Sequence, residues 1–528
     1  MTKKPMESSQ TSRLIPPPGG AVVRMYRIGH GDCFLLAFPG ASSAKPAYVL
    51  IDCGYKPGSP AYICGCQPES VGYFTTSAKE VTDDIRIATG GHLDVAVITH
   101  EHQDHVNGIT EANFKDITIG ETWCAWTEDP DDDFANCLRK KHKDKLLGLL
   151  AARNRLAASG DAAQALRIDQ FLEFELGGVA PEFDAASAAT LLGAAGGPAN
   201  SHNKRSMKIL KDLAEAGVKY LRPDRAVMRV PNTLNARAFV LGPPRDPDLL
   251  EDLDPKRSEE FHTAVSSASP DGYFATAARA ASAGERSEAP FARRYAVEWP
   301  AASQAVFGDD DHPFFSRRYG SGNETPSNDG SASDNAPWRR IDRDWLYSAE
   351  QFALDMNNAT NNSSLVLAFE LGRGGKVLLF AADAQRGNWI SWSKQIWKDG
   401  DASVTARDLF RRTVVYKVGH HGSHNATLNG RSTDDYPNLS WMAEGDHARE
   451  FVAMITAVRA WAETQKGWDH PLKAIKDALT RKASGRVFQT DTSVPTMSMP
   501  TEGSAIDWSS FQKRTRDNRL YFDYEVPG

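Results

Sequence analysis

The chain has 528 residues, of which 41% are hydrophobic and 24% are charged. This composition is that of a globular protein with a large core, and it excludes wholesale disorder, a collagen-like chain and a coiled coil. The 61 lysines and arginines against 68 aspartates and glutamates give a net charge of -7, which excludes a generally basic nucleic-acid binder. Because single cores rarely exceed about 250 to 300 residues, the length alone predicts two to four units.

The compartment follows from cysteine usage and from the N-terminus. All 6 cysteines lie at or before Cys137, and they are too dilute for a secreted disulfide scaffold. Residues 1–20 contain no apolar signal-peptide core, so we expect a flexible segment there. No apolar run approaches the roughly 20 residues that span a bilayer. These features predict a cytoplasmic protein with no membrane partner.

Apolar, β-branched segments open the chain. AVVRMYRIG, CFLLAF and AYVLIDCG follow Gly20 and predict an antiparallel meander, because turn residues separate them. LDVAVITH then predicts a buried strand that ends at a polar cluster. The end of such a strand is where a layered α/β fold exposes its chemistry.

Helical spacing replaces strand patterning between about Asp131 and Leu221, as in LLGLLAARNRL and ALRIDQFLEFEL. ARAFVLGPP predicts a strand, and the Ser-, Gly- and Asn-rich residues 316–337 predict a mobile loop. Core strands are expected at SLVLAFEL, KVLLFAAD and TVVYKVGHH. FVAMITA, the helix PLKAIKDALTRKA and the strand RVFQTD follow.

Three polar clusters each end an apolar strand. The first is HEHQDH, which contains His100, His102, Asp104 and His105. The second contains His420, His421 and His424, and the third delivers Asp383. Imidazole and carboxylate are the ligands of borderline divalent metals, so the first loop alone could face two ions. A buried Asp383 would need compensation, which bridging two cations provides, whereas alone it would be a turn residue.

These motifs carry a resemblance to a known family. HEHQDH matches the HxHxDH signature of the metallo-β-lactamase fold. GHGDCFLL, YVLIDCG, VITHEHQDH, AFVLGPP, NNSSLVL, LLFAAD, YKVGHHGS, WDHP and VFQTD stand in an order similar to the soluble hydrolase domain of ComEC-type competence proteins. The resemblance implies one four-layered αββα domain over 21–528, with insertions at about 112–225, mostly helical, and 245–345, partly a flexible loop.

The same resemblance implies a set of site residues. It makes His100, His102, Asp104 and His105 ligands of two divalent ions, Zn²⁺ or Mn²⁺, with Asp383 bridging them and His420 completing the second site. Asp52 would orient a ligand histidine, and Asp32 would support the same region. Many relatives supply another histidine near the position of Asn362 and Ser363, and the usual glycine before the bridging acid is Ala382.

Two such ions lower the pKa of bound water and hold hydroxide for in-line attack, which suits phosphodiester hydrolysis. The resemblance therefore implies a nuclease acting on nucleic acid, with DNA favoured and the hydroxide near Asp104. His421, Lys417 or His470 would stabilise or protonate the leaving group, although His470 could equally belong to a loop that caps a helix.

Two other functions remain open. The fold also hosts hydrolases of lactones, thioesters and cyclic nucleotides, and a scaffold protein with a relic site is the third reading. The family's membrane channel is absent, so DNA uptake does not carry over. We expect the insertions to cover the site and a regulatory protein or protease to act on the 316–337 loop, as would suit a bacterial anti-phage defence effector.

Overall fold

The computed structural model describes residues 13–42, 45–60, 76–158, 162–177, 201–223, 226–261, 349–465, 468–494 and 505–528. The predicted mobile loop at 316–337 lies outside these ranges, as do residues 1–12 and most of the predicted insertion at 245–345.

One sheet has eight strands in the order β16-β17-β1-β2-β3-β4-β5-β6. Its strands are β1 (Ala21–Tyr26), β2 (Phe34–Phe38), β3 (Ala47–Ile51), β4 (His92–Ile98), β5 (Thr118–Ala125), β6 (Val218–Leu221), β16 (Thr515–Asp517) and β17 (Tyr521–Val526). The antiparallel meander of β1, β2 and β3 is confirmed, and β3 to β6 run parallel.

The second sheet has seven strands in the order β15-β14-β13-β10-β9-β8-β7. Its strands are β7 (Met228–Arg229), β8 (Ala236–Gly242), β9 (Val366–Leu371), β10 (Val377–Phe380), β13 (Thr413–Lys417), β14 (Val452–Ile455) and β15 (Val487–Gln489). β10, β13, β14 and β15 run parallel. A separate hairpin joins β11 (Ile396–Asp399) and β12 (Ala402–Thr405).

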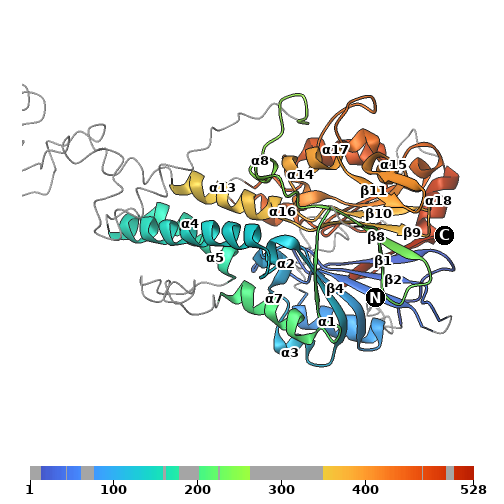
Figure 1. The fold of residues 1–528 in the computed structure, drawn as a ribbon, viewed down its shortest axis with the longest axis horizontal. Helices are drawn as coiled ribbons and strands as arrows, with labels where there is room; N and C mark the ends of the chain where they lie inside the picture. The colour runs from blue at the N-terminus through green and yellow to red at the C-terminus, as the bar shows by residue number, and fades with distance from the viewer. Residues whose placement is uncertain are drawn as a thin grey trace, which may run out of the picture.

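The two sheets pack face to face, with helices on both outer faces (Figure 1). Apolar side chains from both sheets fill the space between them, as where the Phe34 and Phe380 rings lie 5.4 Å apart. Helices α1 (Ala78–Thr89), α3 (Glu111–Phe114) and α7 (His202–Leu213) pack on the first sheet. Helices α14 (Arg386–Trp392), α15 (Ala406–Arg411) and α17 (Lys473–Lys482) pack on the second. The α/β class is confirmed.

Four further helices are short or lie at the periphery of the sandwich. They are α2 (Gln103–Val106), α8 (Pro247–Leu250), α16 (Arg459–Ala462) and α18 (Ala505–Lys513), with 3-10 turns at Trp126–Glu128, Gly419–Gly422, Leu439–Trp441 and Gly445–Arg449. Among the described residues, no helix is both long and apolar enough to cross a membrane.

Three helices project from one side of the sandwich as a unit that we call the helical arm (Figure 1). They are α4 (Asp133–Ala158), α5 (Ala162–Leu176) and α13 (Ala349–Asn362). The arm has an apolar core of its own, to which Leu149, Leu172 and Phe352 contribute. Its helices therefore hold one another even though α13 lies far along the chain from α4 and α5.

The predicted boundaries of the first insertion, about 112–225, are too wide. β5 and β6 lie within that range, yet both are paired strands of the eight-stranded sheet, and α7 packs on its outer face. The alanine- and lysine-rich composition predicted one helical block there. It did not predict β6, whose sequence VKYL is short and only partly buried. The part of that range that lies outside the sandwich is the α4–α5 hairpin of the arm.

Candidate metal centre

The predicted clusters meet where strands of both sheets end. Asp52 follows β3, His100 follows β4, Asp383 follows β10, and His420 follows β13. Parallel strands present their carboxyl ends at one edge of a sheet, where α/β proteins build their sites. Residues from both sheets come into contact there, since His105 Nε2 lies 3.2 Å from Asp383 Oδ2.

The backbone at this edge adopts a sparsely populated conformation. Four non-glycine residues have positive φ, namely Asp52 at 54°, Ala382 at 47°, His420 at 40° and His421 at 52°. Each such residue costs on the order of 1–3 kcal/mol and persists where the surroundings over-determine it. The two loops support each other, because the His420 amide donates to the Ala382 carbonyl at 3.0 Å. Ala382 is thus held in the left-handed region although it carries a Cβ.

His105 stands at the middle of the cluster with its two ring nitrogens in different surroundings. Nδ1 lies 2.8 Å from Asp52 Oδ2, and Thr99 donates to the same carboxylate through its amide and its hydroxyl. Asp52 accepts the Nδ1 proton, so the lone pair of the neutral ring is on Nε2. Nε2 points at Asp383 and lies 3.8 Å from Asp104 Oδ1.

Three buried atoms around that point have no hydrogen-bond partner: Asp104 Oδ1, His105 Nε2 and Asp383 Oδ2. Leaving buried polar atoms unpaired is costly, and it is tolerated mainly at functional sites. His100, His105 and Asp383 offer ligand atoms that all lie within 4.8 Å of one another, so they could hold a metal ion. A divalent cation would satisfy the unpaired atoms, and imidazole with carboxylate is a suitable donor set.

A second group that could hold a metal is formed by Asp32, His105 and His421. The ammonium group of Lys417 lies beside its Asp32 carboxylate. Lys417 Nζ lies 2.5 Å from Asp32 Oδ2 and 3.3 Å from Asp383 Oδ1. Asp32 also accepts a hydrogen bond from the Thr456 hydroxyl at 2.5 Å. Its carboxylate oxygens lie 3.8 Å from His105 Nδ1 and 3.8 Å from His421 Nδ1. This group therefore supports the ligand-bearing loops, with Lys417 balancing the buried carboxylates from behind.

The ionisation of the carboxylates suits a metal. Burial opposes their charge, but neighbouring His105 and His421 hold the pKa of Asp104 and Asp383 well below the ordinary value, with Lys417 also acting on Asp383. Both are therefore anionic at neutral pH, which is the form that binds a cation.

The histidines divide into two kinds. Burial lowers the pKa of His100 well below its ordinary value and that of His420 to about 4, so both rings are neutral. Burial also acts to lower the pKa of His105 and His421. The carboxylates around them, above all Asp383, outweigh burial and raise the pKa of each. A cation binding among these carboxylates would displace those protons.

His102, Asp104 and His420 lie beside the centre but belong to neither group that could hold a metal. His102 Nδ1 lies 3.0 Å from His100 Nε2, and its Nε2 lies 3.0 Å from Glu175 Oε1. Asp104 Oδ2 accepts from His421 Nε2 at 2.9 Å. His420 Nε2 lies 3.2 Å from Asn361 Nδ2. Their roles as ligands stay predictions.

His470 stands in an aromatic cluster beside His420 and His421, at ring-centroid distances of 5.3 and 6.3 Å. Trp468 lies 5.3 Å from it, and both rings pack over buried His30 together with Trp461. We call the partly exposed rings of Trp461, Trp468 and His470 the aromatic platform. The imidazole predicted to approach a leaving group is therefore at the edge of the centre.

Asn362 and Ser363 are not brought to the cluster. Asn362 Nδ2 donates to the Leu249 and Leu250 carbonyls, and Ser363 Oγ donates to the Thr360 carbonyl. Their neighbours make the contacts instead, Asn361 to His420 and Ser364 Oγ to His100 Nδ1 at 3.3 Å. The reason is helical phase: α13 ends at Asn362, and successive residues there point about 100° apart.

Sequence reasoning did not single out several residues of the site. Thr456 follows the end of β14, and His30 belongs to the GHGD motif. The strand end and the motif could therefore have identified these two residues. Glu175, which contacts His102, and His142, which contacts Glu175, lie on arm helices with no motif around them. Only the packing of the arm reveals these two.

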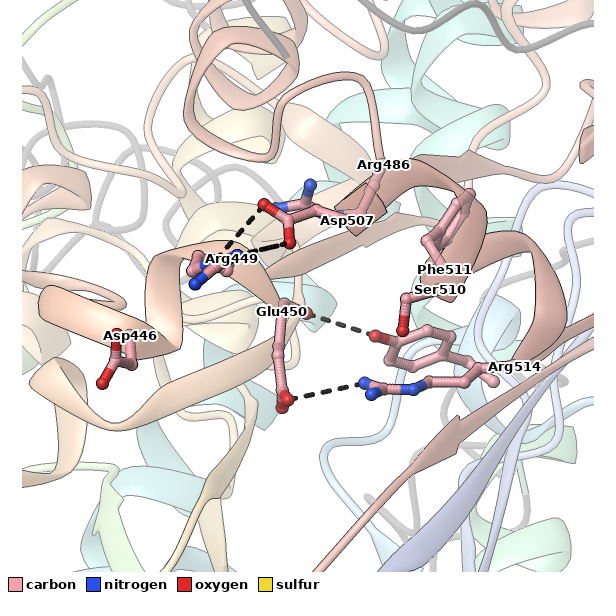
Figure 2. Close-up of a pocket in the computed structure, with 9 residues that line it drawn as sticks. Asp446, Arg449, Glu450, Arg486, Asp507, Ser510, Phe511 and Arg514 are labelled. Atoms are coloured by element: carbon pink, nitrogen blue, oxygen red, sulfur yellow. Dashed lines mark hydrogen bonds and ion pairs between the residues drawn. The ribbon is translucent and has the colours of Figure 1, made fainter. Parts of the chain in front are cut away.

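A polar pocket of about 340 Å³ lies at the other end of β14, preceding Val452 (Figure 2). Figure 2 shows Arg449 directed at Asp507 and Arg514 directed at Glu450, at 3.2 and 3.5 Å. These arginines face carboxylates of the same pocket, so its charges largely balance. We assign it no part in the chemistry of the metal centre.

In comparisons with known proteins, neither a protein-family model nor a curated protein matches this chain.

Proposed function

We propose that the protein is a metal-dependent hydrolase of the metallo-β-lactamase type that cleaves phosphodiester bonds in nucleic acid. The observation that carries the proposal is the convergence of Asp104 Oδ1, His105 Nε2 and Asp383 Oδ2, buried and without hydrogen-bond partners. Two divalent ions, Zn²⁺ or Mn²⁺, would activate a water molecule and neutralise charge on the phosphate.

The residues around that point have distinct tasks in this proposal. His100, His105 and Asp383 would hold one ion, and His102, Asp104 and His420 would complete the ligands of the pair. Asp52 fixes the tautomer of His105 through the bond at 2.8 Å. His421 Nε2 donates to Asp104 Oδ2 at 2.9 Å and its Nδ1 lies 3.0 Å from the Thr456 carbonyl, so this imidazole would donate a proton toward a leaving oxygen once Asp104 released Nε2 to bind a metal ion.

The aromatic platform favours nucleic acid as the substrate. Bases stack on aromatic side chains with about 1–3 kcal/mol each, whatever their sequence. Trp461 and Trp468 are partly exposed beside the centre. Lys56 Nζ lies 3.8 Å from the centroid of the Phe174 ring and 5.9 Å from that of Trp468. A base on the platform would bring its phosphate toward this ammonium and the metal.

A digestion assay tests the proposal. The full chain is incubated with plasmid and single-stranded oligonucleotides in Mn²⁺, Zn²⁺ or chelator, beside Asp104→Ala and His105→Ala. We expect metal-dependent cleavage by the unaltered chain alone. Absence of such cleavage for every nucleic acid, even after limited proteolysis, would contradict the proposal. Metal-dependent turnover of a lactone, thioester or cyclic nucleotide instead would assign the centre to small molecules.

A further inference from the structure

One of the contacts that the helical arm makes with the candidate metal centre comes from a buried carboxylate. We propose that Glu175, on α5 of the arm, is a positioning residue that holds His102 so that its Nδ1 faces the metal centre. This inference rests on the proposed function, because it gives His102 a metal to face.

The geometry assigns both nitrogens of His102. Nε2 lies 3.0 Å from Glu175 Oε1, and Nδ1 lies 3.0 Å from His100 Nε2. A carboxylate accepts and cannot donate, so Glu175 selects the tautomer with the proton on Nε2 and leaves the Nδ1 lone pair toward the centre. The ring cannot turn away easily, because His102 is fully buried and Phe174 packs on it at 4.3 Å.

The rest of the arm fixes Glu175 in turn. His142 Nε2 on α4 and Thr360 Oγ1 on α13 both lie 3.4 Å from Glu175 Oε2. Asn203 on α7 donates to the Glu175 carbonyl at 3.2 Å, which ties the end of α5 to the sandwich. Three arm helices thus converge on one carboxylate that is 2% exposed. Such a buried charge is costly unless it is paired, and its pair is a histidine of the HxHxDH motif.

The consequence is that the arm contributes to metal affinity. Outer partners that orient a ligand histidine are typically worth about 10- to 100-fold in metal affinity. Glu175 is therefore expected to act on the metal centre as Asp52 does, except that it comes from the inserted helices and not from the sheet.

Metal binding to the full chain tests this assignment. Glu175→Met fills the same space but removes the acceptor, whereas Glu175→Gln keeps an acceptor oxygen for His102. Asp169→Asn is the matched control, since Asp169 pairs with Arg153 at 2.7 Å between the same two helices without touching a histidine. Affinity is measured by Zn²⁺ competition with a chromophoric chelator, and ligand geometry by the absorption spectrum of bound Co²⁺.

We expect Glu175→Met to weaken Zn²⁺ binding about 10-fold and to alter the Co²⁺ spectrum. Glu175→Gln should recover most of both readouts, and Asp169→Asn should match the unaltered chain. Equal affinity and spectra for Glu175→Met and Asp169→Asn, with both variants folded by circular dichroism, would overturn the positioning role. If the unaltered chain binds no more Zn²⁺ than Asp104→Ala, the proposed function itself fails.

Discussion

Two buried clusters of charge in this protein both contain aspartates, but they differ in how completely their polar atoms are hydrogen-bonded. On β1, Arg24 donates to both oxygens of Asp523 at 2.7 and 2.8 Å and to Asp84 at 2.6 Å. Tyr26 donates to the same oxygen of Asp84 at 2.7 Å. Only Asp84 Oδ1 lacks a partner in that cluster, and the Tyr521 ring covers the guanidinium.

The metal centre leaves more unpaired, and its unpaired atoms converge. Asp104 Oδ1, His105 Nε2 and Asp383 Oδ2 face one another across loops from both sheets. Mutual pairing, as around Arg24, secures the attachment of α1 and β17 to β1. Around His105, three atoms without a hydrogen-bond partner converge instead, an arrangement that could hold a cation. The difference predicts that substitutions in the two clusters will separate stability from activity.

Removing Asp104, which the proposed function makes a metal ligand, should have the largest effect on activity. Asp104→Ala is expected to lower nucleic-acid cleavage by more than about 1000-fold, beyond the loss of a single transition-state donor. The metal-free protein should lose less stability than Arg24→Met does, because Asp104 gives up one hydrogen bond, to His421, and its other oxygen has no hydrogen-bond partner. Turnover and thermal unfolding of the same preparation measure both. A large loss of stability would mean that this cluster, like that of Arg24, is structural.

Removing the central cation of the other cluster should reverse the pattern. Arg24→Met leaves Asp84 and Asp523 without their partner and should cost about 3–5 kcal/mol of unfolding free energy. Activity per folded molecule should not change. Urea unfolding measures the loss, and adding Asp84→Asn and Asp523→Asn should recover part of it, since no buried charge then stays unpaired.

The stability gained on metal binding should also distinguish the two clusters. A ligand that binds only the folded state at 100 times its Kd stabilises by about 2.7 kcal/mol. We expect Zn²⁺ or Mn²⁺ to give such an increment to the unaltered chain and to Arg24→Met, but not to Asp104→Ala. Thermal unfolding with and without chelator provides the measurement. An equal increment in all three would place the metal elsewhere.

The aromatic platform should give the smallest effect, on binding only. Trp468→Ala is expected to weaken binding of a single-stranded oligonucleotide by about 1–3 kcal/mol, the value of one base stacked on an aromatic ring. Zn²⁺ affinity should be unchanged, because the Trp468 ring packs on His30 and His470, and neither of these is a predicted metal ligand. Fluorescence anisotropy measures binding. Unaltered oligonucleotide affinity would remove the argument for nucleic acid.

The sequence predicted the sandwich well where the signal is local. Strands β1 to β4, β8 to β10 and β13 to β15 lie where apolar, β-branched runs were expected, because such runs are buried on both faces. His100, His105 and Asp383 come together because each follows the end of one of these strands. β6 was absorbed into a helical block, since four half-buried residues carry almost no periodic signal.

What the sequence alone determined is thus the layered α/β core, the strand ends and the residue types that a divalent metal requires. The tertiary structure decided which of those side chains turn inward: Asn361 and not Asn362, and Lys417 behind the ligands beside Asp32. It also decided that Glu175 reaches His102, a contact between residues 73 positions apart. Packing sets the helical phase at the end of α13 and the docking of the α4–α5 hairpin, and neither segment carries a sequence pattern that reveals it.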